Sequence, residues 1–442
     1  MTSTLDAPTG ARFQDTIWLI GGLAILAGVG FVSSYSVNVN RFSLHSLYRN
    51  RLIRAFLGAT NAQREANQFT QFDPSDNPRM TDLWSRRDTT AQWSNADKSD
   101  WQLFHILNMT LNIVSTKRLA WQERKAESFV ATPLHCGSCC KAFRSSSDYG
   151  DKRGISLGTA MAISGAAASP SMGYHSSAGV TFLMGLFNVR LGWWLGNPGD
   201  EGVDTYTDDG PRKAAVPFVK ELFGLTTDDQ PYVYLSDGGH FENLGLYEMV
   251  RRRCRFILVS DAGCDPMFAL ADLGNAVRKI SLDLGVEIRF QGLEKLKPRS
   301  TDGTDIGVDQ PYHAVGEIDY PAADKGGLKG TIIYIKAGFH GVESAGVQSY
   351  AKAHKDFPHE TTADQWFSES QFESYRALGF EIADDLMTRT LKQVGNRAAL
   401  TLEELFACMS EISNLSPAPA WHPRNTISDP GQAVEHAQCC PV

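Results

Sequence analysis

The hydrophobic positions of this chain form one long apolar stretch near the N-terminus and a series of short runs between residues 105 and 336. Runs rich in β-branched and aromatic residues predict strands over His105–Val114, Glu127–Thr132, Tyr232–Leu235, Arg255–Ser260, Tyr312–Asp319 and Thr331–Lys336. Small apolar segments and apolar residues at helical spacing predict helices over Ser156–Ala168, Asn243–Arg253, Phe268–Leu284, Thr362–Gln393 and Leu400–Ile412. Thr401 with Glu404 three residues later is the pattern of a capping box at the start of the last helix.

One strand–helix–strand segment is the best defined part of this pattern. The strand Tyr232–Leu235 is followed by the helix Asn243–Arg253 and then by the strand Arg255–Ser260. This order and spacing predict a right-handed βαβ unit with parallel strands. We therefore expect an α/β fold with a mostly parallel sheet and helices on both of its faces.

The long apolar stretch has no charged residue from Thr16 to Asn40. About 20 apolar residues cross the hydrocarbon core of a bilayer, so we predict a transmembrane helix over residues 17–33. Basic residues follow it at Arg41, Arg49, Arg51 and Arg54. The positive-inside rule then predicts a single-pass, membrane-associated protein whose C-terminal body is cytoplasmic. A buried hydrophobic helix and a secretory signal peptide are the alternatives.

These features divide the 442 residues into four regions. Residues 1–40 hold an N-terminal tail and the membrane segment, and residues 41–345 form the α/β region. Residues 346–413 are a helical C-terminal region. Residues 414–442 are rich in proline and polar residues, which predicts a disordered tail.

Composition excludes several classes of protein. Hydrophobic residues make up 42% of the chain, which is enough for a folded core and too little for a polytopic membrane protein. The 42 basic and 50 acidic residues give a net charge of -8, which argues against nucleic acid as a partner. The 8 cysteines are too few for a disulfide scaffold, so we expect free thiols.

The strongest candidate for chemistry is the turn that follows the strand Tyr232–Leu235. There Asp237 is followed directly by Gly238 and Gly239. A carboxylate at the carboxyl end of a strand lies where open α/β sheets bind ligands, and paired glycines allow a sharp turn with positive φ. We predict that Asp237 acts as a base or as an orienting group. The alternative is a tight turn in which Asp237 only accepts hydrogen bonds from the next helix.

Asp237-Gly238-Gly239, followed by Asn243, resembles the Asp-Gly-Gly motif of the patatin-like phospholipases. The small-residue segment 160–170, which ends in Ala-Ala-Ala-Ser-Pro, resembles a helix that precedes this motif in the family. The resemblance covers about residues 36–384 and points to a bacterial, membrane-associated branch, and to the later half of the patatin-like domain.

The resemblance implies a hydrolase of lipid acyl esters that works through a Ser–Asp dyad without a cofactor or a metal. Asp237 would accept the proton of a serine hydroxyl, and Gly238 and Gly239 would support the turn or the oxyanion hole. The implied substrate is a phospholipid or another lipid ester, which the enzyme would reach at a membrane.

The nucleophile is the open part of this interpretation. Gly154-Ile155-Ser156-Leu157-Gly158 has the Gly-x-Ser-x-Gly pattern of a nucleophile elbow, but a polar loop precedes it where an elbow needs a strand. Ser156 is better explained as the N-cap of the next helix. The nucleophile is then either Ser156 or a serine upstream of Met1, in a longer protein of which this chain is the later part.

Two other classes of function stay open. The first is a non-catalytic lipid-binding or scaffold protein on the same fold. The second is a metal-dependent hydrolase with a site built from Asp237, His240, Asp261 and Asp265.

Three further motifs have simpler interpretations. Cys136 and Cys139 beside His135 have the spacing of half a zinc site, and we interpret them as ordinary thiols. The basic run Arg251–Arg253 predicts a solvated surface, or else a contact with anionic lipid headgroups. The pair Trp193-Trp194 fits either a core or an interfacial position.

Overall fold

A computed structural model describes residues 9–33, 38–40, 43–84, 103–115, 122–169, 184, 190–299, 311–361, 364, 367–394 and 400–413. The chain forms two compact units, one within Met1–Phe241 and the other within Glu242–His436. The predicted disordered tail, residues 414–442, lies outside the described residues.

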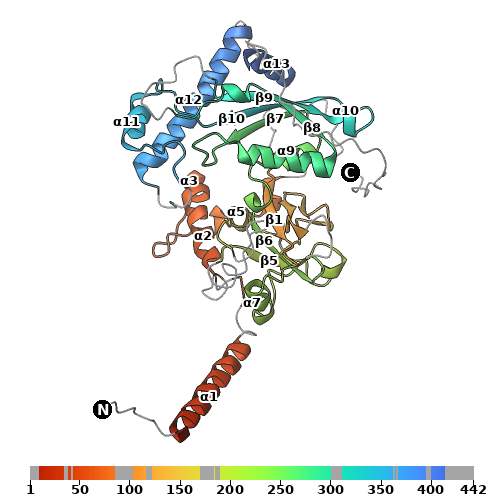
Figure 1. Ribbon diagram of the computed structural model, residues 1–442, viewed down its shortest axis with the longest axis vertical. Helices are drawn as coiled ribbons and strands as arrows, with labels where there is room; N and C mark the ends of the chain where they lie inside the picture. Colours follow the sequence, from red (N-terminus) through yellow and green to blue (C-terminus); the bar gives the residue numbers. More distant parts are fainter. Residues whose placement is uncertain are drawn as a thin grey trace, which may run out of the picture. The chain divides into compact units, whose positions relative to one another are not determined.

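The first unit is built on a six-stranded sheet with the strand order β4-β3-β2-β1-β6-β5 (Figure 1). Its strands are β1 (Leu107–Asn112), β2 (Ala126–Ala131), β3 (His135–Gly137), β4 (Phe143–Ser145), β5 (Trp193–Gly196) and β6 (Tyr232–Asp237). Every neighbouring pair in this sheet is antiparallel. Its helices are α1 (Thr9–Ser33), α2 (Leu44–Leu52), which continues through the π-turn Ile53–Leu57 into α3 (Gly58–Thr60), α5 (Leu157–Ser164) and α7 (Ala215–Leu222). Short 3-10 turns lie at Pro74–Asp76, Met80–Leu83, Asp200–Gly202 and Gly238–His240.

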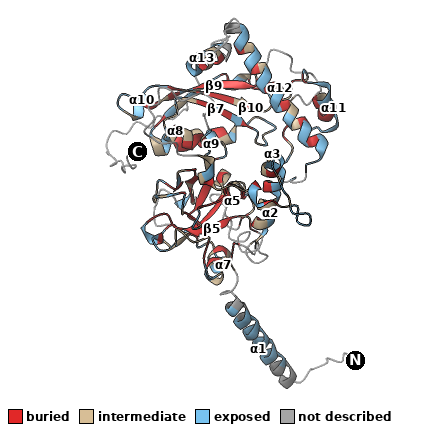
Figure 2. Ribbon diagram, turned by 180° about the vertical axis from the view of Figure 1, so that it is seen from behind, coloured by how far each residue is buried: buried red, intermediate tan, exposed pale blue. Residues whose placement is uncertain are grey.

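Helix α5 covers one face of this sheet. Leu157, Ala160 and Ile163 of α5 are buried in one cluster with apolar strand residues such as Leu111 and Leu235. The other face buries a second cluster around Val39, Trp194 and Tyr234. Figure 2 shows strand β5 of this sheet coloured as buried. Trp193 is 6% and Trp194 is 2% exposed, so both belong to the core.

Helix α1 forms over the predicted apolar stretch, and the large apolar side chains described on it are exposed, with Trp18 at 73%. Over the residues for which the structure describes a position, no helix has the combined length and hydropathy that a membrane span requires. The stretch contains four glycines, at positions 21, 22, 28 and 30. Because glycine has no apolar side chain, these residues lower the mean hydropathy of the helix. This finding contradicts the predicted transmembrane helix at 17–33 and the predicted single-pass topology.

The second unit contains a four-stranded sheet with the order β7-β10-β9-β8. Its strands are β7 (Phe256–Asp261), β8 (Glu287–Gln291), β9 (His313–Asp319) and β10 (Gly330–Lys336). Its helices are α8 (Leu246–Arg251), α9 (Ala271–Leu284), α10 (Tyr320–Ala323), α11 (Ala345–Ala353), α12 (Glu369–Val394) and α13 (Leu402–Ser413), with a 3-10 turn at Leu293–Lys295. Helix α9 lies on one side of the sheet, and α12 and α13 lie on the other (Figure 1).

The prediction of a mostly parallel sheet, which the patatin-like resemblance shares, is wrong. Strands β7 and β10 form the one parallel pair among the described strands, and all other pairs are antiparallel. Strand β6 pairs with β1 on one edge and with β5 on the other. Because both edges of β6 are occupied, β7 has no place beside it, and the predicted βαβ unit does not form.

Elements defined by local pattern lie where the sequence predicts them. Strands β1, β2, β9 and β10 and helix α9 fall within the predicted ranges or one residue outside them. The capping box of α13 is confirmed, because Glu404 N–H donates to Thr401 Oγ1 at 3.2 Å and Thr401 N–H donates to Glu404 Oε2 at 3.0 Å.

Candidate functional site

Asp237 is the last residue of β6 and begins the 3-10 turn Gly238–His240. Its Oδ1 accepts a hydrogen bond from Gly239 N–H at 2.7 Å, so this N–H is not free to bind an oxyanion. Neither Gly238 nor Gly239 has the positive φ that the sequence suggested. Gly238 is needed for space, since a Cβ atom there would lie 2.8 Å from the carbonyl oxygen of Asn108.

The carboxylate of Asp237 has no cationic partner among the residues that the structure describes. The side chain is half-buried, and burial raises the pKa of Asp237, while the hydrogen bond from Gly239 opposes this shift. Tyr48 of α2 lies close enough to interact electrostatically with this carboxylate. Burial first, and the Asp237 carboxylate second, raise the pKa of the Tyr48 phenol. Asp237 is therefore a carboxylate whose charge no cation in the described part of the chain neutralises.

A buried polar network lies directly next to Asp237. Ser236 Oγ is 2.8 Å from His240 Nδ1, and Asn112 Nδ2 donates to the same Ser236 Oγ at 2.8 Å. A serine beside a histidine is the arrangement of an activated nucleophile. Ser236, however, is completely buried and cannot meet a substrate, so we assign these bonds to holding the end of β6 against β1.

The Gly-x-Ser-x-Gly pattern has a structural explanation. Ser156 is the N-cap of α5, as predicted, and its Oγ accepts from Thr159 N–H at 3.3 Å and from Asn77 Nδ2 at 3.1 Å. Gly154 has a φ of +74°, and a Cβ atom there would lie 1.9 Å from the carbonyl oxygen of Ser146. A Cβ atom on Gly158 would lie 2.5 Å from Ile53 Cγ1, so this glycine allows close packing of α5.

Ser156 and Asp237 lie near opposite ends of α5. Ser156 precedes the first residue of the helix, whose 8 residues span about 12 Å. Tyr48, the neighbour of Asp237, lies against Gly165, which is the residue that ends α5. The structure therefore does not bring Ser156 and Asp237 together as a dyad.

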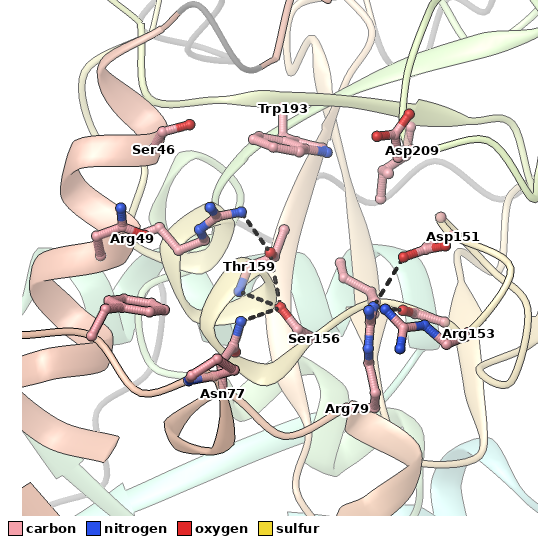
Figure 3. A pocket seen from close by; sticks show the side chains of 17 residues that line it. Ser46, Arg49, Asn77, Arg79, Asp151, Arg153, Ser156, Thr159, Trp193 and Asp209 are labelled. Atoms are coloured by element: carbon pink, nitrogen blue, oxygen red, sulfur yellow. Dashed lines mark hydrogen bonds and ion pairs between the residues drawn. The ribbon is translucent and has the colours of Figure 1, made fainter. Parts of the chain in front are cut away.

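A polar cavity of about 820 Å³ opens at the Ser156 end of α5 (Figure 3). Its charged lining consists of Arg49, Arg79, Arg153, Asp151 and Asp209. No motif in the sequence marks this site, because the three arginines are far apart in the chain. Arg49 is one of the basic residues that follow the apolar stretch. In the structure it lies on α2, and its guanidinium group donates a hydrogen bond to Thr159 Oγ1.

The carboxylates proposed for a metal site are engaged by other groups. Asp261 Oδ1 lies 3.1 Å from Lys336 Nζ, and Asp265 accepts from the N–H groups of Ala269 and Leu270 at 2.8 Å. Within the described ranges, no group of three or more His, Cys, Asp or Glu side chains is placed to hold a metal ion. No observation on these residues favours the metal-dependent alternative.

The arginines of the basic run form ion pairs inside the second unit. Arg251 and Arg252 both bind the buried Glu248, at 2.7 and 2.6 Å. Arg253 forms an ion pair with Asp324. These contacts explain the run as a set of intramolecular ion pairs, in which three arginines share two carboxylates.

Cys136 and Cys139 form no disulfide bond within the described part of the chain. Cys136 is buried on β3 with its Sγ 3.2 Å from Ser146 Oγ, and burial raises the pKa of its thiol to about 11. A thiol with this pKa is an inert part of the core.

The chain was compared with known protein families, with curated proteins and with solved structures, and nothing in any of the three comparisons matches it.

Proposed function

We propose that this chain takes part in the hydrolysis of lipid acyl esters, with Asp237 as the general base. The observation that carries the proposal is the half-buried Asp237 carboxylate with a raised pKa and no cationic partner among the described residues. Carboxylates in this state are characteristic of functional sites, because a purely structural carboxylate is normally paired. The Asp-Gly-Gly resemblance to patatin-like phospholipases supports the same assignment.

The chemistry follows from the position of the carboxylate. The Gly239 N–H holds Asp237 Oδ1, so Oδ2 is the oxygen that accepts the proton of the attacking hydroxyl group. The hydroxyl oxygen then bonds to the acyl carbon, and the ester C–O bond breaks when the tetrahedral intermediate collapses. The proton on Asp237 passes to the leaving alcohol, and water then attacks the resulting acyl ester in the same way, which releases the fatty acid and restores the hydroxyl group. The raised pKa of Tyr48 keeps its phenol protonated as a nearby O–H donor.

The test is hydrolysis of a p-nitrophenyl ester and of a phospholipid by the full chain. Replacing Asp237 with Asn should lower kcat about 100-fold or more, because a general base contributes at least this factor. Asp204→Asn is the matched control, since Asp204 is an exposed carboxylate in the same unit. No hydrolysis by the unmodified chain, or full activity of Asp237→Asn, would contradict the proposal.

Ser156→Ala separates the capping role from a nucleophilic one. Loss of an N-cap costs about 1 kcal/mol of stability, and we expect this cost with an unchanged kcat. A serine-directed fluorophosphonate that labels Ser156 would show instead that this residue is the nucleophile.

The alternative function is non-catalytic lipid binding. One observation favours it, namely that Ser156 Oγ is held by Asn77 and Thr159 away from Asp237. Under this alternative the chain takes no fluorophosphonate label and hydrolyses neither ester, yet still binds lipid.

A further inference from the structure

The cavity beside Ser156 has the size and the chemistry of a small-molecule site. Its volume of about 820 Å³ lies within the usual range for ligand pockets. It is formed by α2, by the segment 72–79, by the loop 150–156 and by β5, so each wall comes from a different part of the first unit. Figure 3 shows the guanidinium groups of Arg49, Arg79 and Arg153 among the side chains that surround it.

Two of the three arginines are positioned by contacts with the wall. An Arg79 guanidinium nitrogen donates to the Gly154 carbonyl oxygen at 2.5 Å and lies 3.2 Å from Asp151 Oδ2. The positive φ of Gly154 lets the loop turn here, close against Ser146. Arg49 reaches Thr159 Oγ1 at 3.5 Å from the α2 side. Arg153 is exposed at the cavity, and no ion pair or hydrogen bond to another described residue would have to break for it to bind a ligand.

The charge of the cavity comes from these side chains and not from the start of α5. The first N–H groups of that helix are already used: Leu157 N–H donates to Pro78 O and Gly158 N–H donates to Asn77 Oδ1, both at 2.9 Å. Thr159 N–H donates to Ser156 Oγ. Any anion in the cavity must therefore be bound by guanidinium groups, hydroxyl groups and side-chain amides.

Three arginines and two aspartates give the lining a net formal charge of +1. One of the aspartates, Asp151, is bound to Arg79. Guanidinium forks match the oxygen geometry of phosphate, and Ser46 and Asn50 add neutral hydrogen-bonding groups to the same lining. A phosphoryl group fits this set of donors.

We propose that this cavity binds a phosphate ester, or free phosphate, through Arg49, Arg79 and Arg153. The site is independent of Asp237, which lies toward the other end of α5. A phospholipid headgroup and a soluble phosphate share the chemistry that these arginines recognise, so the test must separate the two sources.

The test is isothermal titration calorimetry on the full chain at neutral pH and low salt. The probes are inorganic phosphate, sn-glycerol 3-phosphate and glycerophosphoglycerol, which is the deacylated headgroup of an anionic lipid. We expect at least one probe to bind with a Kd of about 1 mM or lower. Tighter binding of the diester identifies a lipid headgroup as the source, and equal or tighter binding of inorganic phosphate identifies a soluble phosphate.

Arg49→Gln and Arg153→Gln should each weaken this binding about tenfold, because each removes a hydrogen bond to a charged group. Arg212→Gln is the control, since Arg212 is an arginine of the same unit whose side chain is 86% exposed and outside the cavity. Arg153→Gln removes an exposed side chain without an ion pair to another described residue, so it tests the site even if the Arg49 variant does not fold. The proposal is overturned if no probe binds, if both variants bind like the unmodified chain, or if D-glycerate binds as tightly as glycerol 3-phosphate.

Discussion

Lys336 Nζ lies 3.1 Å from Asp261 Oδ1 at the ends of the parallel strands β10 and β7, and each side chain is only 2% exposed. Tyr334 donates a hydrogen bond to the other oxygen of Asp261, and Lys336 donates to the Gly263 carbonyl oxygen at 3.1 Å. The pair is therefore surrounded by further polar contacts and sealed from water. Removing either charge of such a pair leaves the other buried and uncompensated, because no solvent is present to take the place of its partner.

Replacing Lys336 with Met should destabilise the second unit by about 3–5 kcal/mol, because Asp261 would be left as an unpaired buried charge. The measurement is urea denaturation followed by far-UV circular dichroism. Arg289→Met is the matched control, because Arg289 and Glu287 form an ion pair with side chains 65% and 61% exposed. Its effect should stay below about 1 kcal/mol. Equal effects of the two substitutions would show that burial of the Lys336 pair has no energetic consequence.

Asp237→Asn should stabilise the first unit at pH 7. The folded state raises the pKa of Asp237 above its ordinary value of 3.8, so it holds the proton more tightly than the unfolded chain does. Protonated Asp237 makes its full contribution to the free energy of unfolding below pH 3.8. This contribution is lost as the pH rises through the raised pKa. Asn keeps an oxygen for the Gly239 N–H and carries no charge. The urea midpoint of the variant should exceed that of the unmodified chain at pH 7, and the difference should shrink below pH 3.8. A lower midpoint at pH 7 would contradict this.

Gly154→Ala should destabilise the first unit by about 2 kcal/mol or more, since the new Cβ would meet the Ser146 carbonyl oxygen and φ is +74°. Gly274→Ala in α9 gives the opposite expectation. A Cβ atom there meets nothing within 4 Å, and replacing a helical glycine with alanine gains about 0.5–1 kcal/mol. Thermal unfolding should show a lower Tm for Gly154→Ala and a higher Tm for Gly274→Ala than for the unmodified chain. A neutral Gly154→Ala would show that the motif glycine has no conformational role.

His45 should stay neutral well below pH 6. It is fully buried against Trp193, and burial lowers the pKa of His45 to about 4. The Leu191 carbonyl oxygen lies 2.5 Å from Nδ1 and can only accept, so Nδ1 carries the proton. Imidazole ¹⁵N chemical shifts of the labelled chain, assigned by comparison with His45→Gln, should show a neutral Nδ1–H ring at pH 5.5.

The same shift gives a stability prediction. Because the folded pKa lies below the unfolded value of 6.5, the folded state resists protonation. The contribution of neutral His45 to the free energy of unfolding is fully present above pH 6.5. It falls by about 3 kcal/mol as the pH drops to about 4. The His45→Gln variant should lose less stability over this range, and an identical pH profile would be evidence against the assignment.

Much of the local structure follows from the sequence. Strands β9 and β10, the N-cap at Ser156 and the capping box of Thr401 and Glu404 were all predicted correctly. Each depends on contacts or periodicity within a few residues, so a short window of the chain contains the necessary information. The position of Asp237 at the end of a strand is also a local property, and the structure confirms it.

Strand pairing and the assembly of the cavity depend on long-range packing. The chain order alone suggested β7 as the neighbour of β6, whereas β1 and β5 occupy both of its edges. Arg49, Arg79 and Arg153 meet only because α2, the segment 72–79 and the loop 150–156 pack around the start of α5. Contacts between distant segments are selected by burial of the whole core, and no local window of sequence carries that information. Local patterns therefore identified the position of Asp237. Only the tertiary structure decided that no described cation pairs with Asp237, that Ser156 lies toward the other end of α5 and that three arginines line one cavity.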